Sequence, residues 1–325
     1  MIMRIKILLL IIITILSAYF MKAYAQGAYS KSFSPYKTAF VSDIHLSFNQ
    51  RDSWILYKES LVILQDVIKL LNKDKTIDYV VFNGDITENK DGQLSDLPMF
   101  LDVVSDLNRP YSVITGDRDV DLAEYIDKKD FMLEFTGNSS SFWSKELNED
   151  ILLIALDTAI KNNFEGTLSD EQLSWLDNEL RNNKNKFIII AMHHNAFPVS
   201  GIVEESLWKD YSINNWQKFN DILNKYQQNK LVISSHRHTQ FYKVINKTIY
   251  LSLPSITSYP CKYTEISILP DKITIENKQI SYKQIVKLAK RQFIKSDMLR
   301  KYSIIGKDEL LKIQKGFSKV EIPLK

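Results

Sequence analysis

The side chains with the greatest capacity for chemistry in this sequence are its histidines and a set of aspartates near them. The chain of 325 residues contains five histidines, and each follows a stretch that predicts a β-strand. The aspartates follow neighbouring predicted strands in the same way. Because ligands bind at the carboxyl ends of the strands in open α/β sheets, we expect these side chains to meet at one edge. The residues selected in this way are Asp43, His45, Asp85, Asp117, His193, His194, His236 and His238.

These residue types predict a metal centre. Imidazole nitrogens and carboxylate oxygens are the ligands that Zn, Mn and Fe take in catalytic sites. The single cysteine, Cys261, excludes an internal disulfide and a thiolate-only metal cage. The candidate ligands are too many for one ion, and they suffice for two divalent or trivalent ions that share a carboxylate. Any single histidine could equally be a packed core residue, but that alternative does not explain why no histidine lies elsewhere.

The elements that must position these residues alternate along the chain. Strand, helix and strand follow one another from Thr38 to Thr115, which predicts a parallel sheet with right-handed crossovers. A second such run follows, and hairpins extend from Phe241 to Asn277. The predicted fold class is α/β: a four-layer α-β-β-α sandwich of two packed mixed sheets flanked by helices, with a helical C-terminal extension. The predicted helices are Tyr57–Leu71, Leu94–Leu107, Ser169–Leu180 (opened by a capping box of Ser169 and Gln172) and Glu204–Tyr226, and the main predicted strands are Thr38–Ser42, Asp78–Asn83, Tyr111–Thr115, Ile151–Leu156, Phe187–Met192 and Leu231–Ser234.

The first 25 residues have the order of a secretory signal peptide. A basic start at Met1–Lys6 precedes the apolar run Ile7–Phe20, and Ala23–Ala25 supplies small residues before Gln26. This order predicts export to the periplasm or the extracellular space. An uncleaved membrane anchor is the alternative, although the apolar run is shorter than a typical membrane span. The predicted division is 1–25 signal peptide or anchor, 37–280 catalytic domain and 281–325 helical basic extension.

The charge balance argues against a nucleic-acid partner. Of the 42 lysines and arginines, Arg4, Lys6 and Lys22 lie in the first 25 residues, which leaves 39 against 39 aspartates and glutamates. Affinity for nucleic acid comes largely from neutralised phosphates, so a neutral mature chain gives no electrostatic reason to expect a nucleic-acid partner. Membrane contact is expected only through the N-terminal segment or the basic tail, whose alternative is a solvated helix face. The pattern predicts no particular oligomeric state.

Five short blocks of this sequence resemble those of the calcineurin-like metallophosphoesterases, in their order and with compatible separations. The segment Gly166–Leu176 is similar to the helix-opening segment of the bacterial class III cyclic-nucleotide phosphodiesterase branch. The resemblance covers roughly Lys37 to Glu276 and leaves out the tail. The blocks are Val41-Ser-Asp43-Ile-His45, Asn83-Gly84-Asp85, Thr115-Gly116-Asp117-Arg118-Asp119, Met192-His193-His194-Asn195 and Ser235-His236-Arg237-His238.

Carried over by position, the resemblance implies two metal ions that share Asp85. It implies a hydrolase of a small phosphorylated substrate, a phosphodiester, in which a metal-bridging hydroxide attacks phosphorus. The predicted signal peptide adds the expectation that this hydrolase is exported. The implied ligands are Asp43, His45, Asp85 and His238 for one ion, and Asp85, Asp117, His193 and His236 for the other.

The third block departs from the family pattern, because Asp117-Arg118 replaces the usual Asn-His pair. Arginine does not deliver a proton, since its pKa stays above about 12, but it grips phosphate oxygens in a bidentate fork. We therefore expect Arg118 to bind substrate, with a salt bridge to Asp119 or Asp121 as the alternative. Of two adjacent residues that leave a strand, only one faces the metals. The resemblance favours His193, so His194 either contacts substrate or packs.

The departure leaves two alternatives to a phosphodiesterase. A Gly-Asn-Arg-Asp version of this block is characteristic of the branch that hydrolyses UDP-diacylglucosamine, which suggests a phosphoanhydride hydrolase of the nucleotide-sugar type. A loss of general acid catalysis suggests instead a catalytically weak, metal-containing module that binds phosphorylated ligands.

Overall fold

The computed structural model describes most of the chain beyond its N-terminal segment. Met1–Pro35 and Tyr36–Lys325 form separate units, and the description below concerns the second. The predicted signal peptide or anchor at 1–25 lies outside the described residues. No helix in the described part of the chain is long and apolar enough to cross a membrane. The described residues are 33–47, 51–88, 96–120, 127–136, 139–160, 163–197, 211–297 and 306–324.

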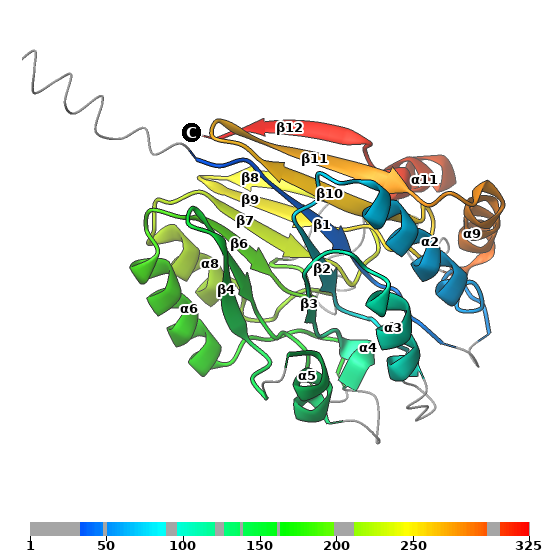
Figure 1. Cartoon of the computed structure of the whole chain (residues 1–325), viewed down its shortest axis with the longest axis horizontal. Coiled ribbons are helices and arrows are strands. Elements are labelled where there is room, and N and C mark those ends of the chain that lie inside the picture. Colours follow the sequence, from blue (N-terminus) through cyan, green and yellow to red (C-terminus); the bar gives the residue numbers. More distant parts are fainter. Residues whose placement is uncertain are drawn as a thin grey trace, which may run out of the picture. The chain divides into compact units, whose positions relative to one another are not determined.

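The first sheet has six strands in the order β12-β11-β10-β1-β2-β3 (Figure 1). Strands β1, β2 and β3 are parallel, whereas β10, β11 and β12 add in antiparallel fashion beside β1. Every residue of β2 is buried, as expected for a parallel strand that is covered on both faces. The strands are β1 (Tyr36–Val41), β2 (Tyr79–Asn83), β3 (Tyr111–Ile114), β10 (Lys262–Ile268), β11 (Lys272–Gln279) and β12 (Lys319–Pro323).

The second sheet also has six strands, in the order β4-β5-β6-β7-β9-β8. Its four central strands are parallel, and an antiparallel strand closes each edge. The apolar runs of β5 and β6 are buried throughout, as expected for parallel strands that are covered on both faces. The strands are β4 (Trp143–Asn148), β5 (Ile151–Ala155), β6 (Phe187–Ala191), β7 (Lys230–Ser234), β8 (Phe241–Ile245) and β9 (Thr248–Ser252).

Each sheet has its own helical cover and its own core (Figure 1). The first core joins β1 and β2 to apolar residues of α2, α3, α9 and α11, and the second joins β5, β6 and β7 to residues of α6 and α8. This arrangement confirms the predicted α/β sandwich of two mixed sheets flanked by helices. The helices are α2 (Ser60–Lys73), α3 (Asp96–Ser105), α4 (Asp117–Val120), α5 (Lys128–Thr136), α6 (Asp170–Asn182), α8 (Trp216–Asn224), α9 (Lys283–Lys295) and α11 (Lys307–Lys315).

Two local predictions need correction: a helix that was predicted too long, and a capping box. The predicted helix Glu204–Tyr226 is shorter in its described part, because only α8 is helical there and Ser212 and Ile213 bridge to neighbouring loops instead. Its first residues, 204–210, lie outside the described residues. Ser169 caps α6 by accepting from the Gln172 backbone N–H at 3.1 Å, but the Gln172 side chain binds the backbone of Asp157 rather than closing the capping box.

The C-terminal extension is helical at α9 and α11, and it also contains a strand that the sequence analysis missed. Strand β12 pairs with β11 and forms the edge of the first sheet. Its pattern is short, with Ile322 buried between the exposed residues Glu321 and Pro323. The extension therefore completes the sheet and its helical cover.

Candidate active site

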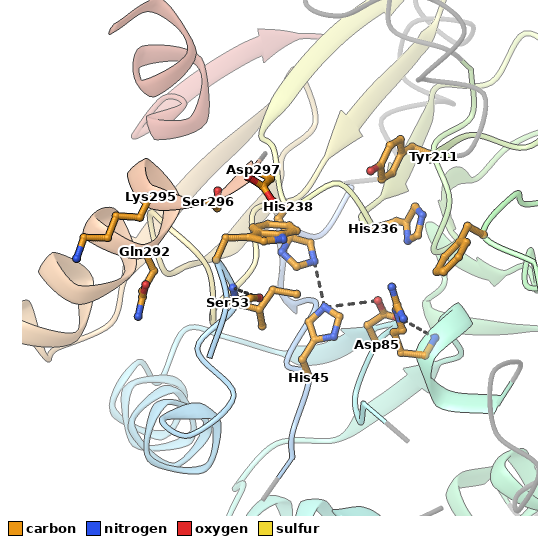
Figure 2. A pocket seen from close by; sticks show the side chains of 14 residues that line it. His45, Ser53, Asp85, Tyr211, His236, His238, Gln292, Lys295, Ser296 and Asp297 are labelled. Atoms are coloured by element: carbon orange, nitrogen blue, oxygen red, sulfur yellow. Dashed lines mark hydrogen bonds and ion pairs between the residues drawn. The ribbon is translucent and has the colours of Figure 1, made fainter. Parts of the chain in front are cut away.

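The loops at the carboxyl ends of β1, β2, β3, β6 and β7 bring the seven candidate metal ligands together. All seven are buried, and a pocket of about 670 Å³ opens over them (Figure 2). They fall into two groups, and within each group the potential ligand atoms lie within 4.8 Å of one another. The groups are Asp85, Asp117, His193 and His236, and Asp43, His45 and His238.

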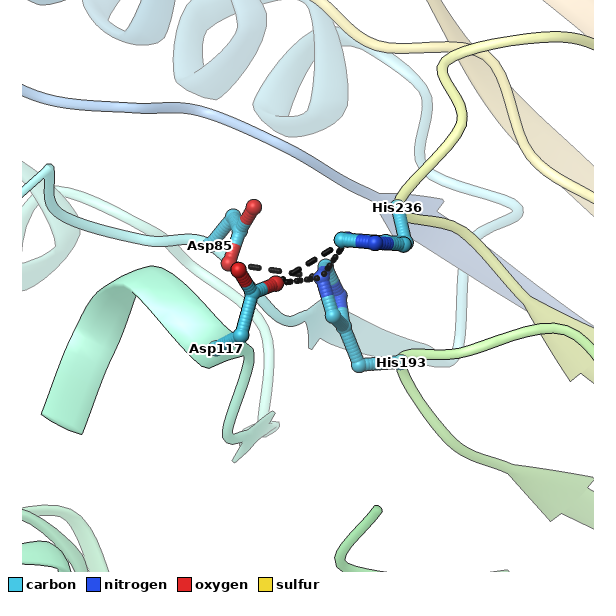
Figure 3. A group of neighbouring side chains, drawn as sticks. All are labelled: Asp85, Asp117, His193 and His236. Atoms are coloured by element: carbon cyan, nitrogen blue, oxygen red, sulfur yellow. Dashed lines mark hydrogen bonds and ion pairs between the residues drawn. The ribbon is translucent and has the colours of Figure 1, made fainter. Parts of the chain in front are cut away.

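In the first group, the carboxylate of Asp117 lies between two imidazoles (Figure 3). Its Oδ1 is 3.0 Å from Nε2 of His193 and 2.9 Å from Nδ1 of His236. The two imidazole nitrogens are themselves 3.1 Å apart. Two nitrogens and a carboxylate oxygen that converge at this separation match the donor set of a bound transition-metal ion.

The second group has the same character. Nε2 of His45 and Nε2 of His238 are 3.1 Å apart, and Nε2 of His238 is 3.4 Å from Oδ1 of Asp43. Asp85 links the groups, because its Oδ2 is 3.5 Å from Nε2 of His45 while its Oδ1 is 3.3 Å from Nε2 of His193. One carboxylate thus presents an oxygen to each group, the arrangement that a ligand shared by two ions requires.

Hydrogen bonds on the far side of three imidazoles fix which nitrogen faces the centre. Nδ1 of His45 contacts Glu88 at 2.8 Å, and Nδ1 of His238 contacts the hydroxyl of Ser258 at 3.0 Å. Nδ1 of His193 lies 3.0 Å from Oγ of Ser235, whose own proton goes to the carbonyl of Asn83. The network therefore assigns Nδ1–H to His193 and leaves Nε2 as the ligand atom. His236 is reversed, since its Nδ1 faces Asp117.

The backbone is turned sharply at most of these ligands. Asp43, His45, Asp85, His236 and His238 all have φ between 48° and 65°, in the left-handed region. Each such turn costs a non-glycine residue about 1–2 kcal/mol, and non-glycine residues in this region cluster at functional sites. The turns aim consecutive side chains of short loops at one point, so the strain is a direct consequence of assembling the site.

Two glycines allow the loops to approach one another. Gly84 has a φ of 79°, and a Cβ there would collide with the imidazole of His193. A Cβ at Gly116 would collide with the backbone nitrogen and carboxylate of Asp85. A larger residue at either position would push apart loops that carry different ligands.

Asp119 supports the loop of Asp85 without joining the ligand groups. Its Oδ1 accepts from the backbone N–H groups of Ile86 and Thr87 at 2.8 and 2.9 Å, and its Oδ2 accepts from Gly116 N–H at 2.8 Å. Burial, together with the nearby charge of Asp85, raises the pKa of Asp119 to about 7. Asp119 thus ties the loops after β2 and β3 together, rather than pairing with Arg118.

The electrostatic balance of the site favours cations. Burial alone would lower the pKa of His193, but Asp85 and Asp117 outweigh it and raise that pKa well above its usual value. The pKa of His45 is raised against burial by Glu88 and Asp85. Buried carboxylates that can be balanced only by protonated imidazoles are expected to exchange those protons for metal ions. The residues present therefore fit the two ions that the sequence predicts.

Arg118 lines the pocket at the edge of the first group. Its backbone N–H donates to Oδ1 of Asp85 at 3.0 Å, and its Nε is 3.4 Å from Oδ2 of Asp117. Nη1 is buried, lies 3.7 Å from Oε1 of Glu88 and has no hydrogen-bond partner among the described residues. The guanidinium lies over the ring of Phe164 at 5.0 Å. The carboxylates of Asp117 and Glu88 thus hold Arg118 at the pocket, and its binding of substrate stays a prediction.

His194 is placed differently from the expectation of substrate contact. It is fully buried and is not part of the pocket lining. Nδ1 lies 2.8 Å from the hydroxyl of Thr158 and Nε2 lies 3.2 Å from the carbonyl of Phe164, so both ring nitrogens are engaged. Burial and the charges of His236 and His193 lower the pKa of His194 well below its usual value. Of the two predicted roles, this placement favours packing, since the ring also lies 4.5 Å from that of His236.

Sequence reasoning missed the residues that hold the ligands. Glu88 and Ser258 lie outside the five blocks and are recognisable only through their contacts, and Ser235 opens the fifth block without having been assigned a role. Gln314 of α11 is the most distant example: its Nε2 donates to the carbonyls of His238 at 2.7 Å and Tyr259 at 2.8 Å, while its Oε1 accepts from Thr239 at 2.9 Å. The C-terminal extension thus clamps the loop that carries His238.

Comparisons with known proteins agree with this geometry. Residues 36–240 match the sequence model of a family described as calcineurin-like phosphoesterase. A probable cyclic nucleotide phosphodiesterase of Coxiella burnetii is 30% identical over 241 residues, covering 72% of this chain and 88% of that protein. A probable glycerophosphodiester phosphodiesterase of Arcobacter nitrofigilis is 28% identical over 217 residues, covering 66% and 76%. A dimetal phosphatase from Danio rerio has the same fold, with a TM-score of 0.63 at 12% identity over 75% of this chain and 96% of that one.

Metal uptake should release protons. In the metal-free protein the pKa of His193 is raised well above its usual value and that of His45 is also raised, so both imidazoles keep their protons to higher pH than an ordinary histidine. A metal ion needs their lone pairs, so affinity should rise with pH until the raised pKa values are passed. Calorimetric titration with Mn²⁺ in two buffers of different ionisation enthalpy measures the released protons. The variant Asp117→Asn lacks a carboxylate that raises the pKa of His193, so it should release fewer protons than the parent on metal uptake. Metal uptake by the parent without any release of protons would contradict this assignment.

Gln314→Ala should weaken metal binding although residue 314 lies outside both groups. Loss of its bonds to the loop of His238 should lower affinity for Mn²⁺ by about tenfold, the lower end of the effect of removing an outer-shell partner. Isothermal titration of a folded variant measures this, and Gln284→Ala, an exposed glutamine on α9, is the matched control. Equal affinity in the parent and both variants would show that the clamp does not position His238.

Proposed function

The chain belongs to the calcineurin-like phosphoesterase family and is a metal-dependent phosphoric ester hydrolase, and from that premise we propose that it hydrolyses phosphodiesters outside the cytoplasm. The observation that carries the proposal is the position of Asp85. Its two carboxylate oxygens face two separate groups of imidazoles and carboxylates, at 3.3 Å from His193 and 3.5 Å from His45. A pair of ions held in this way suits displacement at phosphorus.

The residues of the chain divide the work of such a reaction. Asp43, His45, Asp85 and His238 would hold one ion, and Asp85, Asp117, His193 and His236 the other. When bound, two cations lower the pKa of water and neutralise charge on the phosphoryl oxygens. Glu88, Ser235 and Ser258 keep the imidazoles oriented. Arg118 would bind a phosphoryl oxygen through its guanidinium fork. Burial alone would lower the pKa of Arg118, but the carboxylates of Asp117 and Glu88 outweigh it and raise that pKa.

A diester is favoured over a monoester by the relatives and by the pocket. The two relatives described above are named as phosphodiesterases, one of cyclic nucleotides and one of glycerophosphodiesters. The pocket of about 670 Å³ is within the usual range for organic ligands and exceeds what a phosphate group alone would need. The substrate proposed here is therefore a small phosphodiester with substituents on both sides of phosphorus.

The third block supports a second candidate. Asp117 brings a charged carboxylate where the family usually has a neutral amide, and Arg118 replaces a histidine that would assist the leaving group. A centre without that general acid favours good leaving groups, so cleavage of a phosphoanhydride such as a nucleoside diphosphate sugar is the alternative activity. The remaining alternative is a catalytically weak, metal-containing module that binds phosphorylated ligands.

Hydrolysis of bis(p-nitrophenyl) phosphate with Mn²⁺ tests the proposal. Asp85→Ala should reduce turnover to the background rate, because neither group then has its shared carboxylate. Arg118→Ala should lower kcat/KM by about 10- to 100-fold, the value of a charge-assisted bidentate contact. Arg181→Ala, an exposed arginine on α6, is the matched control and should match the parent. Equal turnover in Asp85→Ala and the parent would refute the enzymatic assignment.

The double variant Asp117→Asn/Arg118→His separates the alternatives within the same assay. If this variant is active and the parent hydrolyses no diester, monoester or anhydride, the result would favour the binding module. A parent that prefers a nucleoside diphosphate sugar to a cyclic nucleotide would favour the anhydride hydrolase.

The proposal of export is supported by the basic, apolar and small-residue order of the first 25 residues. With its native N-terminus expressed in a bacterium, the protein should be recovered outside the cytoplasm and begin at Gln26. A variant without residues 1–25 should stay in the cytoplasm. Recovery of the intact N-terminus in the membrane fraction would indicate an anchor, and full-length protein in the cytoplasm would contradict export.

A further inference from the structure

One wall of the pocket comes from outside the segment that matches the family. Gln292 and Lys295 of α9, together with Ser296 and Asp297 just after it, line the same pocket as His45, Asp85 and His238 (Figure 2). The family match ends at residue 240, more than forty residues before α9 begins. This wall is therefore a property of the C-terminal extension of this chain.

Helix α9 is held firmly in place. Its inner face packs into the first core through Ile285, Ala289 and Phe293, which are 0–9% exposed. The backbone N–H of Ser281, before the helix, donates to the buried carboxylate of Asp66 at 2.6 Å. Gln292 and Lys295 are three residues apart and so neighbour each other on the helix, and Ser296 is its C-cap. A fixed helix end thus places all three residues at the pocket.

The pocket extends to both sides of the metal ligands. Tyr211 lies beside His236, on the opposite side of His238 from Gln292 and Lys295 (Figure 2), and Phe164 also lines the pocket. A phosphodiester carries two substituents, and a phosphorus atom at the ligand groups would direct one toward α9 and one toward Tyr211. The wall of α9 therefore faces one ester arm of the substrate.

The chemistry of this wall is polar with one aromatic surface. Trp54 lines the pocket and packs against His238, with ring centroids 4.6 Å apart. Gln292, Lys295, Ser53 and Ser296 line the same pocket, and Figure 2 shows the side chain of Lys295 extending away from His238 with its ammonium at the outer end. Hydroxyl and carbonyl groups of a sugar or nucleoside find donors and acceptors here, and a flat ring finds the indole. An alkyl chain would leave the polar groups without partners.

We propose that Trp54 and the α9 wall form a specificity subsite for one ester arm, and that this arm is a hydroxylated alcohol of nucleoside or sugar size. The inference rests on the proposed phosphodiesterase function. Gln292 and Lys295 select the arm, while the ligand groups act on phosphorus.

Two diesters with the same leaving group test the subsite in the full-length protein with Mn²⁺. Thymidine 5′-(p-nitrophenyl) phosphate carries a nucleoside arm and ethyl p-nitrophenyl phosphate a minimal one, and both release p-nitrophenol. The parent should prefer the nucleoside arm in kcat/KM. In Gln292→Ala/Lys295→Ala the ratio of the two kcat/KM values should fall about tenfold, as expected from two lost hydrogen bonds. Lys287→Ala, on the same helix but outside this pocket, is the matched control and should keep the parent ratio.

Binding separates failure of the subsite from failure of the proposed function. Thymidine monophosphate should bind the Mn²⁺-loaded parent about tenfold more tightly than ethyl phosphate, and the double variant should lose most of that difference, whether or not either diester is hydrolysed. A parent without this preference, or a double variant that keeps it in both assays, would overturn the subsite. Absence of turnover with the binding preference intact would overturn the phosphodiesterase proposal alone.

Discussion

The structure depends on one carboxylate that serves two sets of ligands. Asp85 leaves β2 in a left-handed turn and presents one oxygen to the group of His193 and the other to that of His45. Carboxylates this deeply buried are unfavourable without cationic partners. The glycines that admit the neighbouring loops, and the hydrogen bonds of Asp119, act to keep Asp85 where both groups reach it. The order of the surrounding loops and the charge balance of the two ligand groups therefore both depend on the position of Asp85.

Much of the fold and the membership of the ligand groups could be predicted, because both follow from local patterns. Apolar runs such as β5 and β6 specify buried parallel strands, and polar residues directly after such strands must meet at one sheet edge. The helix predicted from Glu204 failed in its described part because apolar residues such as Ile213 are buried by a bridge to Gly166 rather than by a helix face. The spacing of apolar residues predicts which side chains are buried, but it does not predict whether a helix or a bridge between loops buries them.

The supports of the site could not be predicted for a different reason. Glu88, Ser258 and Gln314 act across large separations in sequence, and a single glutamate, serine or glutamine has no spacing that indicates a partner. Strand β12 carried a weak local signal, a buried Ile322 between exposed residues, but only its pairing with β11 gives that pattern meaning. For His194 the sequence left substrate contact and packing open, because the contacts of its two nitrogens with Thr158 and Phe164 have no local signal.

The clamp made by Gln314 also has a consequence for biosynthesis. Helix α11 follows every ligand of the centre in the sequence, so during synthesis the loop of His238 gains its support only after all the ligands have been made. A chain cut before α11, by a premature stop codon or by proteolysis, would keep every histidine and aspartate of the centre and lack the element that orders one of its loops.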